Sequence, residues 1–101
     1  MTDFDYQQID DLIHSRIRLS IIALLVSCEQ APFVFIREKT GASDGNLSVQ
    51  LRKLEEASFV DVKKEFKKRK PISTYSITSK GRAAFLEYVK QIESILHVGD
   101  N

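Results

Sequence analysis

The strongest chemical signal in this 101-residue chain is a run of basic residues. Residues 63–70 hold six lysines and arginines against one acid, Glu65, namely Lys63, Lys64, Lys67, Lys68, Arg69 and Lys70. Neighbouring cations repel one another unless an anion lies close, so the run predicts a surface that meets phosphate or another anionic partner. The alternative is a solvated loop whose lysines keep strand edges from pairing.

A second group of polar residues lies upstream, in residues 43–57. Asn46 can both donate to and accept from a base edge, Arg52 and Lys53 can reach guanine or phosphate, and Val49 can touch a thymine methyl group. The candidate contacts in this segment are Ser43, Gly45, Asn46, Ser48, Val49, Gln50, Arg52 and Lys53. Any solvated helix face carries similar residues, so this group by itself favours neither reading. Together with the basic run it favours nucleic acid.

Helices must position the polar group in residues 43–57. Apolar spacing predicts a short N-terminal helix that runs into a longer one over residues 17–26, with Ser15 as a candidate cap. Residues 31–32 (Ala-Pro) break this pattern. A helix of barely two turns, residues 33–40, then ends at Gly41, and Ser43 caps a third helix that runs to about Ala57. The buried stripe of the third helix is Leu47, Leu51 and Leu54.

The apolar period then changes to that of a hairpin. Residues 59–66 alternate as a strand, residues 67–71 form a polar basic turn, and residues 72–77 return as the second strand. Thr78 caps a last helix from Ser79 to about His97. The order predicts an α+β, mainly α fold, a winged helix-turn-helix with a long C-terminal helix used for dimerisation.

This arrangement gives each basic or polar group a role. The later helix of a helix-turn-helix lies in the major groove of DNA, which predicts that residues 43–57 read base edges. The hairpin, with Lys67, Lys68, Arg69 and Lys70, meets the backbone or the minor groove. We expect the hairpin tip to contribute most of the salt dependence of binding and little of the sequence choice.

The ends of the chain predict a homodimer. The last helix carries more apolar residues than a small core can cover, and the N-terminal segment adds further ones. We expect one domain over residues 1–101, with residues 1–13 and 79–97 as dimerisation elements. The alternative is that both termini pack on their own domain.

Other functions find little support in the composition. A nucleophile elbow, a phosphate-binding glycine loop and an HExxH motif are all missing from the sequence, so we expect no enzyme. His14 and His97 lack metal-ligand spacing, and no cofactor is expected. The single cysteine, Cys28, agrees with a reducing compartment. Its place at the end of an apolar helix beside Glu29 predicts a packing role, and a thiol sensor is the alternative. No apolar run is long enough to span a bilayer, so we expect a cytoplasmic protein with no membrane partner.

The sequence also resembles the small winged-helix transcriptional regulators related to the MarR and ArsR groups. The resemblance rests on GNLSVQLRKLEEASFVDVKKEFKKRKPISTYSITSKGRAAFLEYV and on the upstream IHSRIRLSIIALL, and covers roughly residues 8–96. It implies a homodimer whose two recognition helices lie in successive major grooves of DNA. By position it makes Asn46, Ser48, Val49, Arg52 and Lys53 groove-facing, and it makes residues 67–70 the wing.

Two positions depart from the pattern of these regulators. Gln50 stands where related sequences often carry histidine, and Ser58 stands where a glycine commonly ends the recognition helix. Serine tolerates a left-handed backbone less well than glycine, so we expect the turn after this helix to differ.

The leading hypothesis is therefore sequence-specific binding of double-stranded DNA by a homodimer, acting most simply as a repressor. The rival is a winged-helix module that uses the same face for a protein partner. Structured RNA is a weaker third reading, because no aromatic stacking platform is evident. The sequence leaves a small-molecule effector open.

Overall fold

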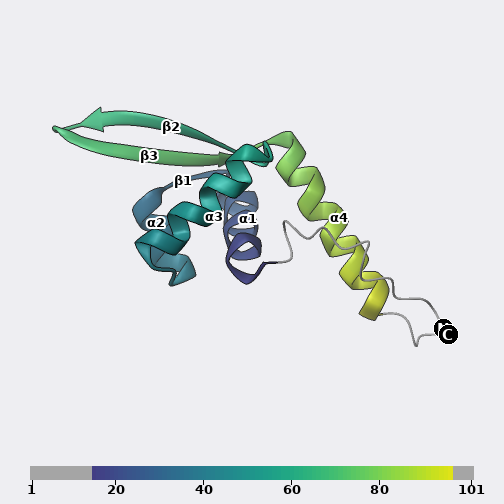
Figure 1. Cartoon of the computed structure of the whole chain (residues 1–101). Coiled ribbons are helices and arrows are strands. Elements are labelled where there is room, and N and C mark those ends of the chain that lie inside the picture. The colour runs from purple at the N-terminus through teal and green to yellow at the C-terminus, as the bar shows by residue number, and fades with distance from the viewer. Residues whose placement is uncertain (1–14, 97–101) are drawn as a thin grey trace.

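The computed structural model describes residues 15–96, which form four helices and a three-stranded antiparallel sheet (Figure 1). In chain order the elements are α1 (Arg16–Cys28), β1 (Gln30–Pro32), α2 (Phe33–Thr40), α3 (Asp44–Glu56), β2 (Val60–Lys67), β3 (Lys70–Ile77) and α4 (Ser79–Leu96). The predicted fold class, mainly helical with a hairpin and a long last helix, is confirmed. The predicted helix and dimerisation element within residues 1–13 lie outside the described residues, as do His14 and His97.

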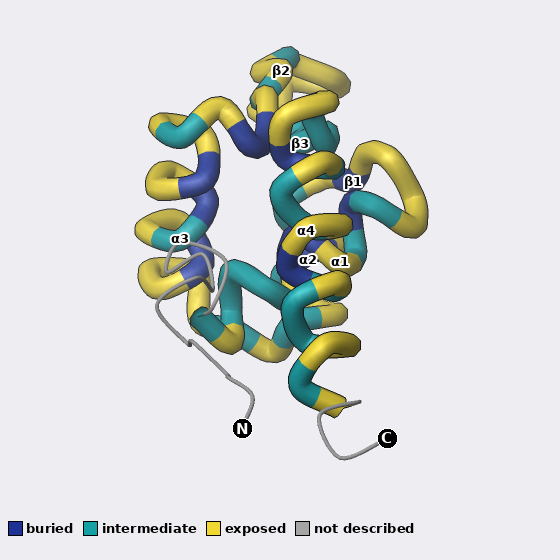
Figure 2. Tube along the Cα trace, turned by 90° about the vertical axis from the view of Figure 1, so that its right-hand side faces the viewer, coloured by how far each residue is buried: buried dark blue, intermediate teal, exposed yellow. Residues whose placement is uncertain are grey.

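The helix-turn-helix follows the sequence signals closely. α2 spans the predicted residues and ends at Gly41, whose φ of 71° is left-handed. Ser43 caps α3 by accepting a hydrogen bond from the Asn46 backbone N–H at 3.2 Å. The predicted stripe of Leu47, Leu51 and Leu54 is fully buried. Figure 2 shows the result, with the inner side of α3 buried and its outer side exposed.

The sheet corrects two expectations. Its order is β1-β3-β2, and β1 pairs residues 30–32 with residues 74–76 of β3. The strand β1 was not predicted, because three residues ending in proline show no period and such a strand is stabilised only by its partner. The predicted five-residue basic turn is also wrong: β2 and β3 pair up to Lys67 and Lys70, which leaves two residues in the turn.

The core lies where α1, α2 and α3 meet the base of the hairpin. Its fully buried side chains come from all four elements, and they are Ile21, Ile22, Leu25, Ile36, Leu47, Leu51, Leu54 and Val60. Among the described residues no polar or charged side chain is buried. The free energy of this core therefore comes from apolar burial, and the polar chemistry of the domain is left on its surface.

The two ends of α1 differ from what the sequence predicts. Ser15 holds the N-cap position, but within the described chain its side chain makes no capping hydrogen bond. The packing role predicted for Cys28 is wrong: the thiol is exposed at the end of α1, 3.4 Å from the Gln30 carbonyl oxygen. By helical spacing Cys28 continues the face of Ile21 and Leu25, but it is the last residue of α1 and is left exposed there.

Ser58 forms the left-handed turn that glycine usually supplies. Its φ is 65°, its N–H donates to the Glu55 carbonyl at 2.9 Å, and the Phe59 N–H donates to the Leu54 carbonyl at 2.9 Å. This is the Schellman pattern of helix ends. The expectation of a different turn is therefore wrong, because the two hydrogen bonds and the burial of Phe59 hold the serine in a strained backbone.

Replacing Ser58 by glycine should raise the free energy of unfolding by about 1 kcal/mol, since glycine adopts this φ without the Cβ penalty. Urea titration followed by circular dichroism measures the change. The matched control is Ala57→Gly, at a φ of −84°, which should lower stability instead. Equal effects of the two variants would contradict this explanation.

The start of α4 is fastened to the end of α3 and the base of the hairpin. Thr78 Oγ1 accepts from the Gly81 N–H at 2.9 Å and donates to the Ser58 carbonyl at 2.7 Å, as predicted for a helix cap. The Thr78 N–H donates to the Phe59 carbonyl at 3.1 Å. This junction sets the direction in which α4 leaves the domain (Figure 1). In the described part of the chain, no helix combines the length and apolar character needed to cross a lipid bilayer.

Candidate nucleic-acid interface

α3 is held at its N-terminus in a way that presents its first turns to solvent. Arg37 of α2 forms an ion pair with Asp44 at 2.8 Å. Asp44 also lies in the first helical turn, where a negative charge interacts favourably with the helix dipole. The hydrogen bond and charge of Asp44 raise the pKa of the Arg37 guanidinium. The pair bridges the two helices across the tight turn, and the exposed half of α3 begins directly after it.

The exposed residues of α3 divide into an outward face and two flanks. At 100° per residue, Gly45 and Val49 point directly away from the buried leucines. Ser48 and Arg52 fall on the flank that faces the hairpin, where both line a cavity shared with β2 and β3. Asn46 and Gln50 fall on the opposite flank, which faces α1. Every candidate on α3 is exposed except Gln50, which is half-buried.

The α1 flank contains a chain of side-chain hydrogen bonds. Arg18 of α1 donates to Gln50 Oε1, and Gln50 Nε2 donates to Asn46 Oδ1 at 3.0 Å. Because one acceptor site of the Asn46 amide is engaged by Gln50, the amide has a set orientation and its NH₂ group remains to donate outward. α1 thus acts on the candidate reading residues, a contribution that was not predicted from the sequence.

The hairpin, which we call the wing (residues 60–77), divides its charges between two faces. Side chains alternate along a strand and cross-strand partners share a face. Lys63, Glu65 and Lys67 therefore share the outer face, where Glu65 forms ion pairs with Lys63 at 3.2 Å and with Lys67 at 3.7 Å. The hydrogen bond and charge of Lys63, then the charge of Lys67, lower the pKa of the Glu65 carboxyl. The predicted basic run is thus partly neutralised on this face.

The inner face of the wing meets α3. Lys64 and Ser73 pair across the strands, as do Val62 and Tyr75. A polar cavity of about 260 Å³ opens between the wing and α3, lined by Phe33, Ser48, Arg52, Glu55, Lys64, Ser73 and Tyr75. Burial, and then the charge of Glu55, raises the pKa of the Tyr75 hydroxyl, which therefore stays a neutral hydrogen-bond donor. Two cations, three hydroxyls and the carboxylate of Glu55 converge here from separate elements.

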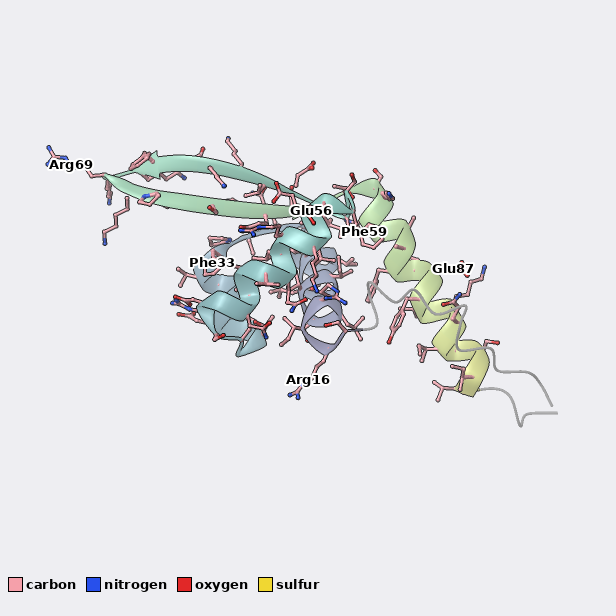
Figure 3. The ribbon with its side chains drawn as sticks, viewed as in Figure 1. Arg16, Phe33, Glu56, Phe59, Arg69 and Glu87 are labelled. Carbon is pink, nitrogen blue, oxygen red and sulfur yellow. The ribbon has the colours of Figure 1, made fainter. Side chains whose placement is uncertain are left out.

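The tip of the wing is the two-residue turn Lys68-Arg69. Their φ values are 51° and 66°, the left-handed pair of a type I′ turn. Asn-Gly is the usual sequence at such a turn, so two long cationic side chains are an unfavourable local choice. Figure 3 shows Arg69 at the far end of the hairpin, pointing away from the helices. Strained backbone of this kind occurs most often at functional sites, which makes the tip a candidate contact.

The structure thus brings most of the predicted residues to one side of the domain, but not in one patch. Ser48 and Arg52 meet the wing directly, whereas Lys68 and Arg69 stand at its end and Lys67 and Lys70 share its outer face. Arg18, Ser73 and Tyr75 also belong to the candidate interface and were not predicted. Strand alternation and hairpin pairing could have placed Ser73 opposite Lys64, but nothing in the sequence pairs Arg18 with Gln50.

A second, apolar feature lies away from the wing. α1 and α4 diverge and leave an open groove of about 400 Å³ between them. The groove is lined almost wholly by apolar side chains, which are Leu19, Ala23, Phe85, Tyr88, Val89, Ile92 and Leu96, with Glu93 at its margin. Leu96 is 72% exposed. An apolar surface of this extent on a small domain is typical of a contact site.

Comparison with known proteins places this geometry among DNA-binding domains. Residues 17–96 match the family described as the winged helix DNA-binding domain. An uncharacterized protein of Methanocaldococcus jannaschii is 41% identical over 81 residues, covering 80% of this chain and 88% of that protein.

Two solved structures share the fold. A transcriptional regulator homologue of Pyrococcus horikoshii superposes with a TM-score of 0.81 at 24% identity, covering 89% of each chain. A MarR-family transcriptional regulator of Silicibacter pomeroyi superposes with a TM-score of 0.67 at 17% identity, covering 95% of this chain and 66% of the other.

Proposed function

Because this chain belongs to the winged helix DNA-binding domain family, we propose that it binds double-stranded DNA sequence-specifically, as a homodimeric transcription regulator that represses by occupying a promoter. The observation that carries the proposal is the joint surface of α3 and the wing. Ser48 and Arg52 of α3 line one cavity with Lys64 and Ser73 of the wing. A phosphodiester backbone that follows this cavity would bring base edges to α3 and the neighbouring groove to the wing.

In this proposal the two parts of the interface have different tasks. The first turns of α3 enter the major groove, where Asn46 and Arg52 read base edges and Val49 contacts a thymine methyl group. The contributing residues of α3 are Ser43, Gly45, Asn46, Ser48, Val49, Gln50, Arg52 and Lys53. On the wing, Lys67, Lys68, Arg69 and Lys70 approach phosphates, and they add affinity that depends on salt but not on sequence.

Replacing Asn46 by alanine should therefore reduce discrimination between sequences by about 1–3 kcal/mol at one base position. Binding selection from a randomised duplex library, followed by competition titration of the selected site against its single-base variants, measures this. The matched control is Glu56→Ala, an exposed position on the last turn of α3, which should leave the preferred sequence unchanged. Loss of affinity for all duplexes alike in Asn46→Ala would contradict a reading role.

The homodimer is supported by the apolar groove between α1 and α4. A second copy of α4 would cover this groove, including Leu96, which is exposed at the end of α4. Two-fold symmetry would place two recognition helices on one side of the dimer, as binding to successive major grooves requires. The single domain would then span residues 1–101, with residues 1–13 and 79–97 completing the dimer.

Replacing Leu96 by glutamate should shift the protein from dimer to monomer, because it places a charge in an apolar contact. Sedimentation velocity at micromolar protein concentration measures the state. Leu86→Glu is the matched control, since Leu86 is exposed on the same helix but does not line the groove. A monomeric wild type, or an unchanged dimer in Leu96→Glu, would overturn the proposed interface.

A further inference from the structure

An exposed aromatic side chain near the tip of the wing has no part in the functions assigned so far. Phe66 is 76% exposed, which makes it the most exposed of the large apolar side chains among the described residues. It occupies β2 opposite Pro71 of β3, two residues before the turn. Leaving this much apolar surface in water is unfavourable, and a partner that covered it would gain the free energy of its burial.

The register places Phe66 on the inner face of the wing. Reading from the base of the hairpin, the cross-strand pairs on this face are Val60 with Ile77, Val62 with Tyr75, Lys64 with Ser73, and Phe66 with Pro71. The first pair belongs to the core and the third lines the cavity beside Ser48 and Arg52. By register, Phe66 thus continues the same surface as the α3–wing cavity towards the end of the hairpin. Figure 1 shows that this end of the hairpin extends beyond the helices.

The charges around Phe66 indicate what would cover it. Lys64 stands two residues earlier on the same face, about 7 Å along the strand, and the cationic turn Lys68-Arg69 follows two residues later. An apolar centre with cations before and after it complements a narrow groove with apolar walls between two rows of anions. The minor groove of DNA has this form: it is about 6 Å wide, with phosphates along both rims.

We propose that Phe66, backed by Pro71, is an apolar wedge that enters the minor groove of duplex DNA, partly unstacks one base step and bends the duplex. The proposal rests on the proposed function. Apolar side chains inserted in this way kink DNA, and the bend brings more of the backbone onto the protein. Flexible pyrimidine–purine steps deform at the lowest cost, so the wedge favours TpA and CpA steps at a position that no hydrogen bond reads.

The test compares wild type, Phe66→Ala and Phe66→Leu on a duplex of about 25 base pairs, labelled at its two ends as a FRET pair. Versions with and without a TpA step beneath the wing are used. Wild type should bring the labels closer together and prefer the TpA version. Phe66→Ala should bind about tenfold more weakly, with an unchanged salt slope, no bend and no TpA preference, while Phe66→Leu keeps most of the bend.

The matched control is Leu86→Ala, which removes another exposed apolar side chain, this one from α4, and should leave the FRET signal unchanged. If wild type binds the duplex without bending it, or Phe66→Ala binds and bends it as wild type does, the wedge is wrong while the proposed function stands. If Phe66→Ala instead changes the sedimentation of the free protein, the side chain serves a protein contact and the wedge is wrong. If wild type binds no duplex at any salt, the proposed function fails as well.

Discussion

Replacing Gly81 by alanine should lower the free energy of unfolding by roughly 2–4 kcal/mol and the melting temperature by on the order of 10 °C or more. A Cβ at this position would lie 2.2 Å from the Phe59 carbonyl oxygen and 2.9 Å from its carbon. These are backbone atoms, so no side-chain rotation relieves the contact. The gain of about 1 kcal/mol in helix propensity from alanine is smaller than this clash.

The clash also breaks the junction that orients α4. The Phe59 carbonyl accepts from the Thr78 N–H at 3.1 Å and shares the one proton of the Thr78 hydroxyl with the Ser58 carbonyl, at 3.0 Å from Oγ1. Displacing this carbonyl therefore weakens the cap of α4 together with the base of the wing. Thermal and urea denaturation measure the loss. Gly45→Ala is the matched control, because nothing lies within 4 Å of its Cβ position, and it should raise stability by about 0.5–1 kcal/mol. A Gly81→Ala protein as stable as wild type would contradict the packing described here.

The second large effect concerns the wing tip, where stability and binding should change in opposite directions. Replacing Lys68-Arg69 by Asn-Gly supplies the sequence that a type I′ turn prefers, and should stabilise the protein by about 1–2 kcal/mol. The same change removes two cations. It should weaken binding to any duplex about 10–100-fold at low salt and reduce the slope of log K against log salt by about 0.9 for each phosphate that is no longer neutralised.

Fluorescence anisotropy at several salt concentrations, paired with urea denaturation, measures both effects. The matched control is Lys63→Ala, which removes a cation that is already paired with Glu65 on the outer face of the wing and should change the salt slope less. A tip variant that is more stable and binds as well as wild type would show that Lys68 and Arg69 do not contact DNA.

Particular residues show how far the sequence could predict this molecule. The apolar stripe of α3, the cap at Ser43, the stop at Gly41 and the cap at Thr78 are local signals, and all lie where they were expected. The strand β1 has no such signal, because residues 30–32 become a strand only through pairing with β3. The left-handed backbone of Ser58, Lys68 and Arg69 could not be predicted, because none of these residue types favours a positive φ. Hydrogen bonds and strand pairing outweigh the local cost of about 1 kcal/mol for each residue.

The candidate interface divides in the same way. Residue type and helical period sufficed to propose Asn46 and Arg52, and a count of charges sufficed to propose the wing. Three-dimensional contacts were needed to see that Arg18 orients Gln50 and Asn46. Register was needed to see that Glu65 partly neutralises the outer face while Lys64 and Phe66 share the inner one. Spacing alone gives the period of a strand but not which of its two faces meets α3.

Recognition of DNA by α3 and the wing is tested most directly by measuring how wild-type protein binds duplex DNA as a function of salt. Anisotropy titrations would compare a duplex from the promoter of the protein's own gene with a mixed-sequence duplex. If about three to five cations of each protomer contact phosphate, log K should fall linearly with log salt at a slope of about −5 to −9 for the dimer. The promoter duplex should bind more tightly at every salt concentration. Absence of binding to either duplex at low salt, or binding that does not respond to salt, would contradict DNA recognition by α3 and the wing.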